Sequence, residues 1–334
     1  MREEDAKMEK ITWEMSAEEA VGSSRAAFIK KIYELAKTND KICLVNCDCS
    51  PAGSVQDKFS KDFGDRFIDT GIMEQTACGL AAGLALSGKT VFCQAFGPFL
   101  STRAIEFVYL DGAYNDAPVT YVGTHCGVTA AAGPTHAAVL DIAFMRSMPN
   151  MTVISPADAG QIEKVIEAAV DYPHPIYIRC ARGEEPLVYK SNDYKYEIGK
   201  AIIAREGKDI TLIGCGNGVH QCVVAAELLE KEGINARVID MHTIAPLDKE
   251  VIYAAMRETK GIVTCEDHMV NGGLGSAVAE VVSACEDPSL RIPVKRLGLP
   301  VTEFFIQGEP EEVYAYYGYD YNGVRKAAKE LLGR

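Results

Sequence analysis

The chain has 334 residues, of which 48% are hydrophobic and 24% charged, and its formal net charge is -13. That length allows two domains with separate cores, and the composition is typical of globular proteins. The negative charge argues against a nucleic-acid surface, which would show a basic stripe.

The first 20 residues are strongly charged, so we expect a polar N-terminal arm and neither a signal peptide nor a membrane anchor. No apolar run approaches the roughly 20 residues that span a bilayer. The eleven cysteines include no CxxC pair. We interpret them as reduced core thiols of a cytoplasmic protein, and Cys47 and Cys49 alone do not complete a metal site.

From Ser24 onward, short apolar segments alternate with helical patterns, which is typical of a parallel sheet with helices on both faces. The strands expected in the first half cover residues 42–46, 66–70, 90–94, 118–124, 151–155 and 175–179. The helices expected between them cover 24–36, an Ala/Gly-rich segment beginning at Glu74, 102–114 and 156–170.

The pattern lapses into polar, turn-rich sequence at 183–199, and a second α/β unit follows. Its expected strands cover 210–214, 236–240, 261–265 and 292–297, and its expected helices cover 223–233, 249–258 and 276–285. The predicted fold class is therefore α/β, with two domains that each hold a mostly parallel sheet with helices on both faces. We expect these domains at 21–188 and 201–334, joined by a linker at 189–200.

The segment FIDTGIMEQTACGLAAGLALSG, residues 67–88, places a glutamate at the start of an almost uncharged helix. A buried carboxylate is costly unless another group pairs with it or uses it. Glu74 is therefore a candidate functional residue.

Histidines and aromatic residues follow the ends of two other strands. In GPTH, a rigid Gly-Pro turn presents His136, and His125 lies eleven residues earlier at the end of a strand. Two imidazoles at these positions can reach one cleft beyond the carboxyl ends of the strands, although a core or surface role for both stays open. Phe96 and Phe99 in FGPF either pack in the core or stack on a flat heterocycle.

Two glycine-rich segments are less specific. GCGNGV, residues 214–219, lacks the GxGxxG spacing, so a tight strand-to-helix turn is a better interpretation than a dinucleotide site, although Asp240 ends the next strand. EDHMVNGGLGSAVAE, residues 266–280, predicts a loop before a helix. That loop suits either an anion or a turn at a subunit contact, and His268 alone is more often structural than catalytic.

Together these segments resemble the transketolase family of thiamine diphosphate enzymes. RFIDTGIMEQTACGLAAGLALSG and AAGPTHAAVLDIAFMRSMPNMTVISPAD are similar to two successive signatures of that family. DITLIGCGNGV, ARVIDMHTIAPLD and EDHMVNGGLGSAVAE are similar to its C-terminal domain. The sequence has no counterpart of the family's diphosphate-binding domain with its GDG…N metal motif. It therefore resembles the C-terminal, pyrimidine-binding subunit of a split transketolase.

The resemblance implies roles around the cofactor. Glu74 matches the glutamate that shares a proton with ring nitrogen N1′ of the aminopyrimidine, which requires a carboxyl partly removed from water. Phe96 and Phe99 match the aromatic pair around that ring, and Asp48 matches an acid near the cofactor. The resemblance implies no metal ligand in this chain, because a partner subunit holds Mg²⁺ and the diphosphate.

It also implies roles around the substrate. His136 matches a histidine near the substrate hydroxyls and the thiazolium, and it is expected to be catalytic with Glu74. His125 matches a histidine that binds the far end of the substrate. Arg25 and Arg182 fall where arginines hold a sugar phosphate, which suits a bidentate guanidinium.

One departure from the family concerns Ala131 and Ala132, which stand where transketolases usually carry Glu-Asp. The family's aspartate recognises a hydroxyl of the donor ketose. The donor is therefore either an unusual ketose, or its hydroxyl is recognised by other residues.

The resemblance implies a two-subunit transketolase that transfers a two-carbon ketol unit from a ketose or its phosphate to an aldose or its phosphate. We expect thiamine diphosphate and Mg²⁺ as cofactors, activity only with the N-terminal subunit, a self-dimer within an α2β2 heterotetramer, and neither nucleic acid nor membrane as a partner. The alternatives are the β subunit of a 2-oxoacid dehydrogenase's decarboxylating component, a deoxyxylulose-phosphate-synthase-like activity, and a non-catalytic interaction subunit that keeps the fold.

Overall fold

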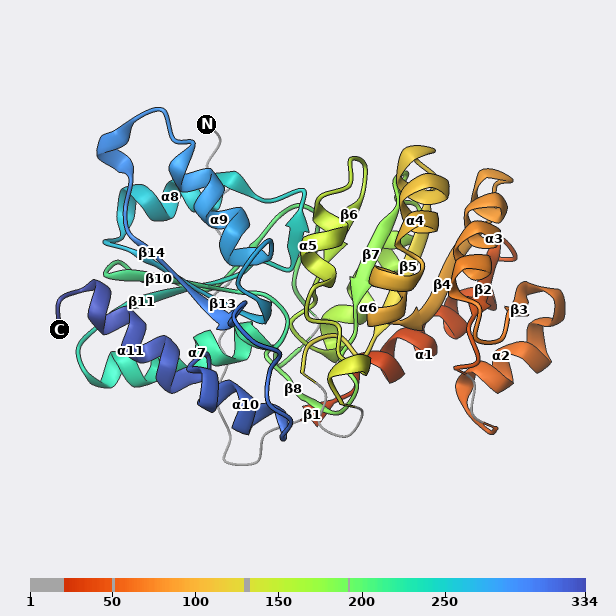
Figure 1. Cartoon of the computed structure of the whole chain (residues 1–334), viewed down its shortest axis with the longest axis horizontal. Helices are drawn as coiled ribbons and strands as arrows, with labels where there is room; N and C mark the ends of the chain where they lie inside the picture. Colours follow the sequence, from red (N-terminus) through yellow and green to blue (C-terminus); the bar gives the residue numbers. More distant parts are fainter. Residues whose placement is uncertain (1–20, 50–51, 129–132, 192) are drawn as a thin grey trace.

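The computed structural model describes residues 21–49, 52–128, 133–191 and 193–334. It shows two α/β units side by side, which Figure 1 colours red to green and cyan to blue. Each unit holds a mostly parallel sheet between helices, so the predicted fold class is confirmed. The polar arm expected at 1–20, Ala131 and Ala132 lie outside the described residues.

The first unit contains a seven-stranded sheet with the order β12-β6-β7-β5-β4-β2-β3. Its strands are β2 (Ile42–Asn46), β3 (Phe67–Asp69), β4 (Thr90–Phe96), β5 (Val119–Thr124), β6 (Thr152–Ile154), β7 (Ile176–Arg179) and β12 (Thr243–Ala245). Every pair is parallel except β12 with β6. Strand β12 was not predicted, and it comes from the second half of the chain, so the edge of the first sheet is built by a segment beyond the expected linker.

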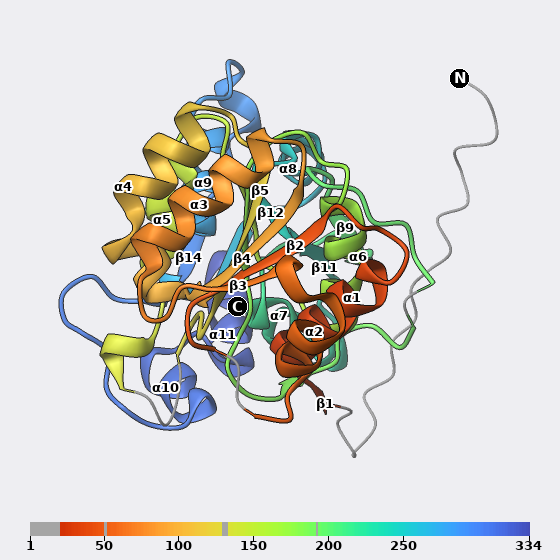
Figure 2. The ribbon, with the colours of Figure 1, turned by 90° about the vertical axis from the view of Figure 1, so that its right-hand side faces the viewer.

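Helices cover both faces of this sheet, as Figure 2 shows. One face carries α1 (Ser24–Ala36), α2 (Val55–Phe63) and α6 (Ala159–Ala169), and the other carries α3 (Glu74–Leu86), α4 (Ile105–Phe107) and α5 (Asp141–Arg146). The short turns η1 (Gly64–Arg66) and η4 (Pro134–His136) connect elements of this unit. Phe28, Phe59 and Phe92 form a core on the first face, and each is 0% exposed.

Helix α3 is rich in Ala and Gly because it packs closely against its neighbours. Ala77, Ala81 and Ala85 are buried in the core cluster shared with β4. A Cβ at Gly79 would lie 3.0 Å from Asp111 Oδ2, so this glycine serves close packing within the domain. A Cβ at Gly83 would meet nothing within 4 Å, so that position faces open space.

The segment 102–114 was predicted to be a helix, and the structure shows that most of it is π-helical and not α-helical. The structure has π-helical turns at η2 (Phe99–Arg103) and η3 (Val108–Tyr114), with the short α4 between them. Ser101 Oγ donates to the Gly97 carbonyl at 2.8 Å, and Thr102 Oγ1 donates to the Pro98 carbonyl at 2.5 Å. Such hydroxyls compete for carbonyls of the preceding turn, which favours wider winding.

The second unit contains a five-stranded sheet with the order β14-β13-β10-β11-β9. Its strands are β9 (Ile202–Arg205), β10 (Ile210–Gly214), β11 (Ala236–Asp240), β13 (Ile262–Met269) and β14 (Val294–Leu299), and only β9 pairs antiparallel. The helical segments are α7 (Asn217–Lys231), α8 (Lys249–Glu258), α9 (Leu274–Ser283), η5 (Pro288–Leu290), α10 (Pro310–Tyr317) and α11 (Tyr321–Leu331). Helices α8 and α9 lie on one side of the sheet, and α7 and α11 lie on the other (Figure 1).

The chain between the two units has little regular structure. The described residues from 187 to 201 form no helix or strand. A short ladder of β1 (Val21–Gly22) with β8 (Glu185–Pro186) precedes this segment. Within the described residues, no helix is long and apolar enough to cross a membrane. All eleven cysteines are free thiols, and ten of them are buried.

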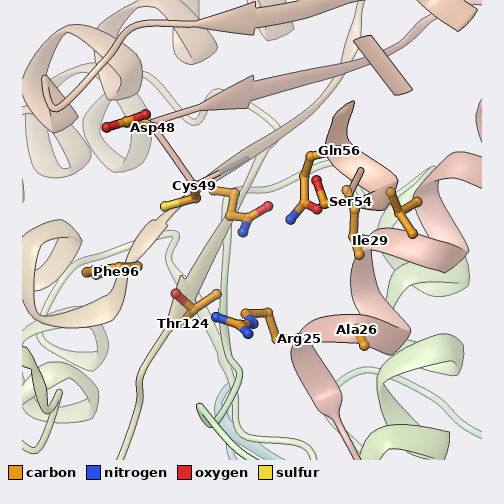
Figure 3. Close-up of a pocket in the computed structure, with 11 residues that line it drawn as sticks. Arg25, Ala26, Ile29, Asp48, Cys49, Ser54, Gln56, Phe96 and Thr124 are labelled. Carbon is orange, nitrogen blue, oxygen red and sulfur yellow. The ribbon is translucent and has the colours of Figure 1, made fainter. Parts of the chain in front are cut away.

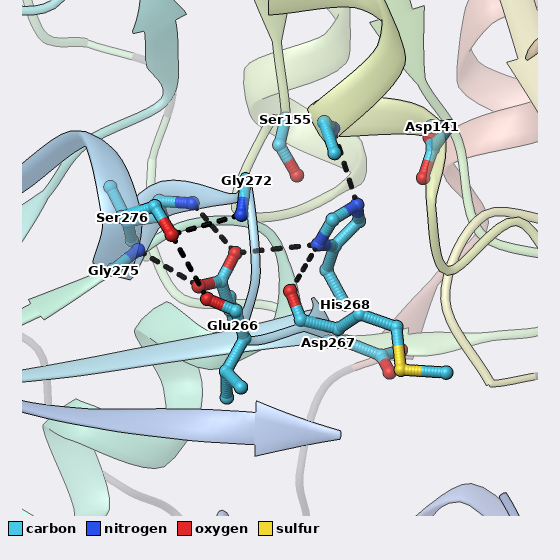
Figure 4. Close-up of polar contacts among 12 residues, drawn as sticks. Asp141, Ser155, Glu266, Asp267, His268, Gly272, Gly275 and Ser276 are labelled. Atoms are coloured by element: carbon cyan, nitrogen blue, oxygen red, sulfur yellow. Dashed lines mark hydrogen bonds and ion pairs between the residues drawn. The ribbon is translucent and has the colours of Figure 1, made fainter. Parts of the chain in front are cut away.

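The loop expected at the start of EDHMVNGGLG is instead a strand. Strand β13 continues through Met269, so Glu266 and His268 lie inside the sheet. Leu274 N and Gly275 N donate to the Glu266 carboxylate at 2.7 and 2.8 Å, as Figure 4 shows. The acceptor at the N-terminus of α9 is therefore the Glu266 side chain and not an external anion.

His268 is a structural residue in this arrangement. Its side chain is fully buried, its Nδ1 lies 2.6 Å from the Met269 carbonyl, and its Nε2 accepts from Ala143 N at 3.4 Å (Figure 4). Burial lowers its pKa to about 4, so the ring is neutral at physiological pH.

The structure confirms the tight-turn interpretation of GCGNGV. A Cβ at Gly214 would lie 2.6 Å from the Gly218 carbonyl carbon, so the strand and helix approach too closely for a side chain. Asp240 is buried and accepts hydrogen bonds from Gln161 Nε2 at 2.7 Å and Tyr189 OH at 2.6 Å. That carboxylate is therefore engaged inside the fold.

Candidate active site

The candidate site lies where the strand order of the first sheet reverses. The chain places β3 on one side of β2 and β4 on the other. In open α/β sheets, ligands bind beyond the carboxyl ends of the strands at such a point. Asp48 follows β2, Phe96 ends β4 and Thr124 ends β5.

A pocket of about 480 Å³ opens at this point, lined by residues from α1, α2 and the strand ends. Three predicted site residues, Arg25, Asp48 and Phe96, line it together. Figure 3 shows Arg25 and Gln56 reaching from α1 and α2 into the space that faces the strands. Gln56 and Gln94 also line this pocket, and neither was predicted from the sequence.

Four predicted rings form a cluster beside the pocket. The centroids of Phe96 and His125 lie 4.1 Å apart, and those of Phe96 and Phe99 lie 5.8 Å apart. His136 lies edge-on to Phe99, with a centroid distance of 5.2 Å. The structure therefore brings the two predicted imidazole rings and the two predicted phenylalanine rings together from three segments of the chain.

His125 is held as a neutral imidazole. It is 4% exposed, and its Nδ1 lies 3.1 Å from Thr124 Oγ1. Burial lowers its pKa to about 4, and the charges of Arg182 and Arg25 contribute to the same shift. Its backbone has a φ of 61°, a left-handed conformation that non-glycine residues rarely adopt and that is typical of functional sites.

Glu74 begins helix α3 and is 3% exposed. Arg103 Nη1 donates to its Oε2 at 2.9 Å, and the Arg103 guanidinium carbon lies 4.5 Å from the centroid of the Phe99 ring. Arg103 thus joins the buried carboxylate to the ring cluster. This arginine was not predicted from the sequence. The one feature that could have indicated it is its positive charge within the mostly apolar segment FLSTRAIEF.

Asp48 and Arg182 lie at the margins of the site. Asp48 is exposed and has a left-handed φ of 49°, and its N–H donates to Asp69 Oδ1 at 3.1 Å. Arg182 lines a separate cavity of about 730 Å³ between the two units, although its charge acts on His125. Among the described residues, no group of three or more His, Cys, Asp and Glu is placed to hold a metal ion.

Comparisons with known proteins show the family of the chain. Residues 22–186 match the family described as the transketolase pyrimidine binding domain, and residues 199–324 match the transketolase C-terminal domain. One of the subunits of the apulose-4-phosphate transketolase of Phocaeicola vulgatus is 38% identical over 309 residues, which are 92% of this chain and 97% of that protein. The chain belongs to the transketolase family.

Other transketolases show which part of the enzyme the chain represents. A putative transketolase C-terminal section of Methanocaldococcus jannaschii is 37% identical over 92% of this chain and 96% of that protein. Human transketolase is 34% identical over 93% of the chain, but the match spans only 49% of the human protein. A solved structure described as the inactive β4 tetramer of a split-gene transketolase has a TM-score of 0.85 at 37% identity, covering 93% of this chain and 98% of that one. The chain thus corresponds to the pyrimidine-binding and C-terminal domains of transketolase.

Proposed function

We propose that this chain is the pyrimidine-binding subunit of a two-subunit cytoplasmic transketolase. It transfers a two-carbon ketol unit from a ketose or ketose phosphate to an aldose or aldose phosphate, and it is active only with an N-terminal subunit. The observation that carries the proposal is the buried Glu74 carboxylate joined through Arg103 to the ring cluster. The eleven free thiols support a reducing compartment.

The residues at the site fit the aminopyrimidine of thiamine diphosphate. A carboxyl group of 3% exposure suits a ring nitrogen, and the faces of Phe96 and Phe99 suit a flat heterocycle. When bound, thiamine diphosphate supplies the carbanion-stabilising chemistry of carbon–carbon cleavage and formation. Glu74 holds a proton at ring nitrogen N1′, and the Phe96 and Phe99 rings orient the heterocycle.

Other residues of the chain bind and orient the sugar. His136 lies beside both phenylalanines, where it contacts the reacting end of the substrate. The neutral His125 binds a hydroxyl, because an uncharged imidazole both donates and accepts. Arg25 in the pocket and Arg182, whose charge also acts on His125, bind the phosphate, and Asp48 lies near the cofactor.

An apolar surface on η3 and on α3, the helix that Glu74 begins, supports assembly with a partner. The exposed apolar side chains of α3 and η3 are Leu80, Leu86, Tyr109, Leu110 and Tyr114. We call this surface the α3–η3 face. Exposed apolar surfaces of this kind mark protein interfaces. We propose that it contacts the other chains of an α2β2 assembly and that the N-terminal subunit holds Mg²⁺ and the diphosphate.

Reconstitution tests this proposal. The purified chain is mixed with a purified N-terminal transketolase subunit, thiamine diphosphate and Mg²⁺, and ketol transfer is followed with D-xylulose 5-phosphate, D-fructose 6-phosphate and 6-deoxy-6-sulfo-D-fructose as donors. Transfer with the mixture and none with either chain alone is expected. Decarboxylation of pyruvate without ketol transfer would contradict the proposal in favour of a 2-oxoacid dehydrogenase component. If the mixture catalyses neither reaction with any donor, that result would favour a non-catalytic subunit.

A further inference from the structure

Two buried glutamine side chains line the pocket, and an oxygen atom of one of them has no hydrogen-bond partner in the described part of the chain. Gln94 lies on β4, two residues before Phe96, and is 1% exposed, and its Oε1 is a buried atom without a partner. Gln56 lies in the first turn of α2 and is 6% exposed. Both carboxamides line the same pocket as Arg25.

A buried glutamine with a purely structural role normally forms its hydrogen bonds with other residues of the protein. Gln161 is equally buried, and its Nε2 donates to Asp240 Oδ2 at 2.7 Å while its Oε1 accepts from Ala157 N at 2.7 Å. An unsatisfied buried polar group costs roughly 1–3 kcal/mol. In contrast to Gln161, the Oε1 of Gln94 accepts no hydrogen bond from any residue that the structure describes, and its position on the pocket wall indicates a ligand as its partner.

We propose that Gln94, assisted by Gln56, is a specificity-determining residue that binds a hydroxyl group of the sugar substrate. A carboxamide carries both a donor and an acceptor, as a hydroxyl group does. A phosphate dianion offers acceptors only, so it suits the Arg25 guanidinium but not the Oε1 of Gln94. The pocket therefore fits a sugar with its charged end at Arg25 and a hydroxyl at Gln94.

This inference rests on the proposed function, which brings a sugar phosphate into the pocket. It goes beyond that function because it assigns hydroxyl recognition to an amide on the wall of the sheet. Gln94 stands among the apolar residues of VFCQAF, and its side chain points to the same face as Phe92 and Phe96. That alternation places the amide on the α1–α2 face of the sheet, where the pocket opens.

Calorimetric titration tests the proposal without requiring turnover. D-ribose 5-phosphate, its 2-deoxy analogue and its 3-deoxy analogue are titrated into the full chain, alone and after mixing with the N-terminal subunit, for wild type and for Gln94→Met. Met has a similar shape but no amide. Wild type is expected to bind D-ribose 5-phosphate about tenfold or more tightly than one of the deoxy sugars. In Gln94→Met that ratio is expected to fall below about twofold, while the affinity for that deoxy sugar stays the same.

Two controls separate recognition from folding. Gln94→Met is expected to keep or raise the melting temperature, because the buried oxygen that it removes has no partner among the described residues. Gln161→Met is expected to lower it, because it removes the two hydrogen bonds of Gln161. Gln56→Met, an independent variant in the same pocket, is expected to reduce the affinity ratio in the same direction.

The outcomes distinguish this inference from the proposed function. An unchanged affinity ratio in Gln94→Met, an equal loss of affinity for all three sugars, or no binding of any sugar to wild type would overturn the role of Gln94. Ketol transfer combined with any of those results would leave the proposed function standing. The expected ratios without ketol transfer would support the hydroxyl site and refute the transketolase activity.

Discussion

Arg103 Nη1 donates to Glu74 Oε2 at 2.9 Å, and this contact joins η2 to the start of helix α3. The carboxylate is 3% exposed, whereas the arginine side chain is 43% exposed. The buried carboxylate of Glu74 is therefore paired with a cation that reaches it from the more exposed side of the site.

Glu74→Gln keeps the shape of the side chain but removes its capacity to hold and release a proton. We expect this variant to lower kcat of the reconstituted enzyme by roughly 10²–10⁴-fold, the usual range for a general acid–base residue. Steady-state ketol transfer measures the effect. Glu167→Gln is the matched control, because Glu167 is 53% exposed and pairs with Lys31 away from the site. A kcat for Glu74→Gln within about twofold of wild type would remove the role that we assign to this carboxylate.

A buried ion pair of the first unit also makes a hydrogen bond to the second unit. Arg179 Nε donates to Asp141 Oδ2 at 2.7 Å, and its Nη2 donates to the carbonyl of Asp267 in the second sheet at 3.2 Å. Burial raises the pKa of Asp141, but the charge of Arg179 and its hydrogen bonds outweigh that effect and hold the pKa below its ordinary value. The arginine is thus required to keep a fully buried carboxylate ionised.

We expect Arg179→Met to lower the free energy of unfolding by about 3–5 kcal/mol, because it leaves the charge of Asp141 buried and unpaired. Urea denaturation at pH 7 measures the loss. The double variant Arg179→Met, Asp141→Leu removes both charges and is expected to recover a large part of it. A double variant no more stable than Arg179→Met alone would show that packing, and not the unpaired charge, accounts for the loss.

Much of the first unit was predictable because its strands are continuous apolar runs. Such runs, separated by helical patterns, predict a buried parallel sheet, and the sheet order then gathers the ends of β2, β4 and β5. Strand β12 was not predictable, because its three residues form an antiparallel edge and carry no periodicity. The polar residues at the end of β13 suggested a loop, and only the amides of α9 explain why Glu266 is buried there.

Some residues of the candidate site were likewise predictable from the sequence, and others were not. Glu74 stood out because a carboxylate begins an uncharged helix, and its position depends only on local sequence. Arg103 and Gln94 did not stand out, because their importance depends on tertiary contacts. Arg103 reaches Glu74 across 29 residues of chain. Gln94 looked like an ordinary strand residue until the structure showed a pocket and no partner for its buried oxygen among the described residues.

We predict that the titration of Asp240 makes the free energy of unfolding of the protein depend on pH. Burial raises its pKa to about 7, although Tyr189 and Gln161 donate hydrogen bonds to it. In the unfolded chain its pKa is about 3.9. A raised pKa in the folded state means that the contribution of this group to stability is complete below about pH 4 and is lost as the pH rises through about 7.

Asp240→Asn removes this titration while an amide oxygen remains to accept the two hydrogen bonds. Relative to wild type, we expect the variant to gain on the order of 2–4 kcal/mol of unfolding free energy between about pH 4 and pH 8. Urea denaturation at both pH values measures the difference. Asp57→Asn is the control, because the hydrogen bond from Lys61 lowers the pKa of Asp57, so any change should have the opposite sign. A difference for Asp240→Asn that does not vary with pH would contradict a raised pKa.

We predict that the α3–η3 face is the surface that contacts the N-terminal subunit. Leu80 lies on α3 and is 37% exposed, and Tyr114 on η3 is 73% exposed. The side chain of Leu187 has the same exposed fraction, 37%, but follows β8 near the junction of the two units. The two leucines therefore form a matched pair that differs mainly in location.

We expect Leu80→Glu to weaken assembly with the N-terminal chain at least about tenfold, because a charge in the centre of an apolar interface must be desolvated. Leu187→Glu should assemble as wild type does. Sedimentation equilibrium of the mixed chains measures both dissociation constants, and the melting temperature of each isolated chain is expected to change little, because both side chains are partly in water. If Leu80→Glu assembles normally while Leu187→Glu does not, the N-terminal chain docks at the junction of the two units, and the apolar residues of α3 and η3 contact something else.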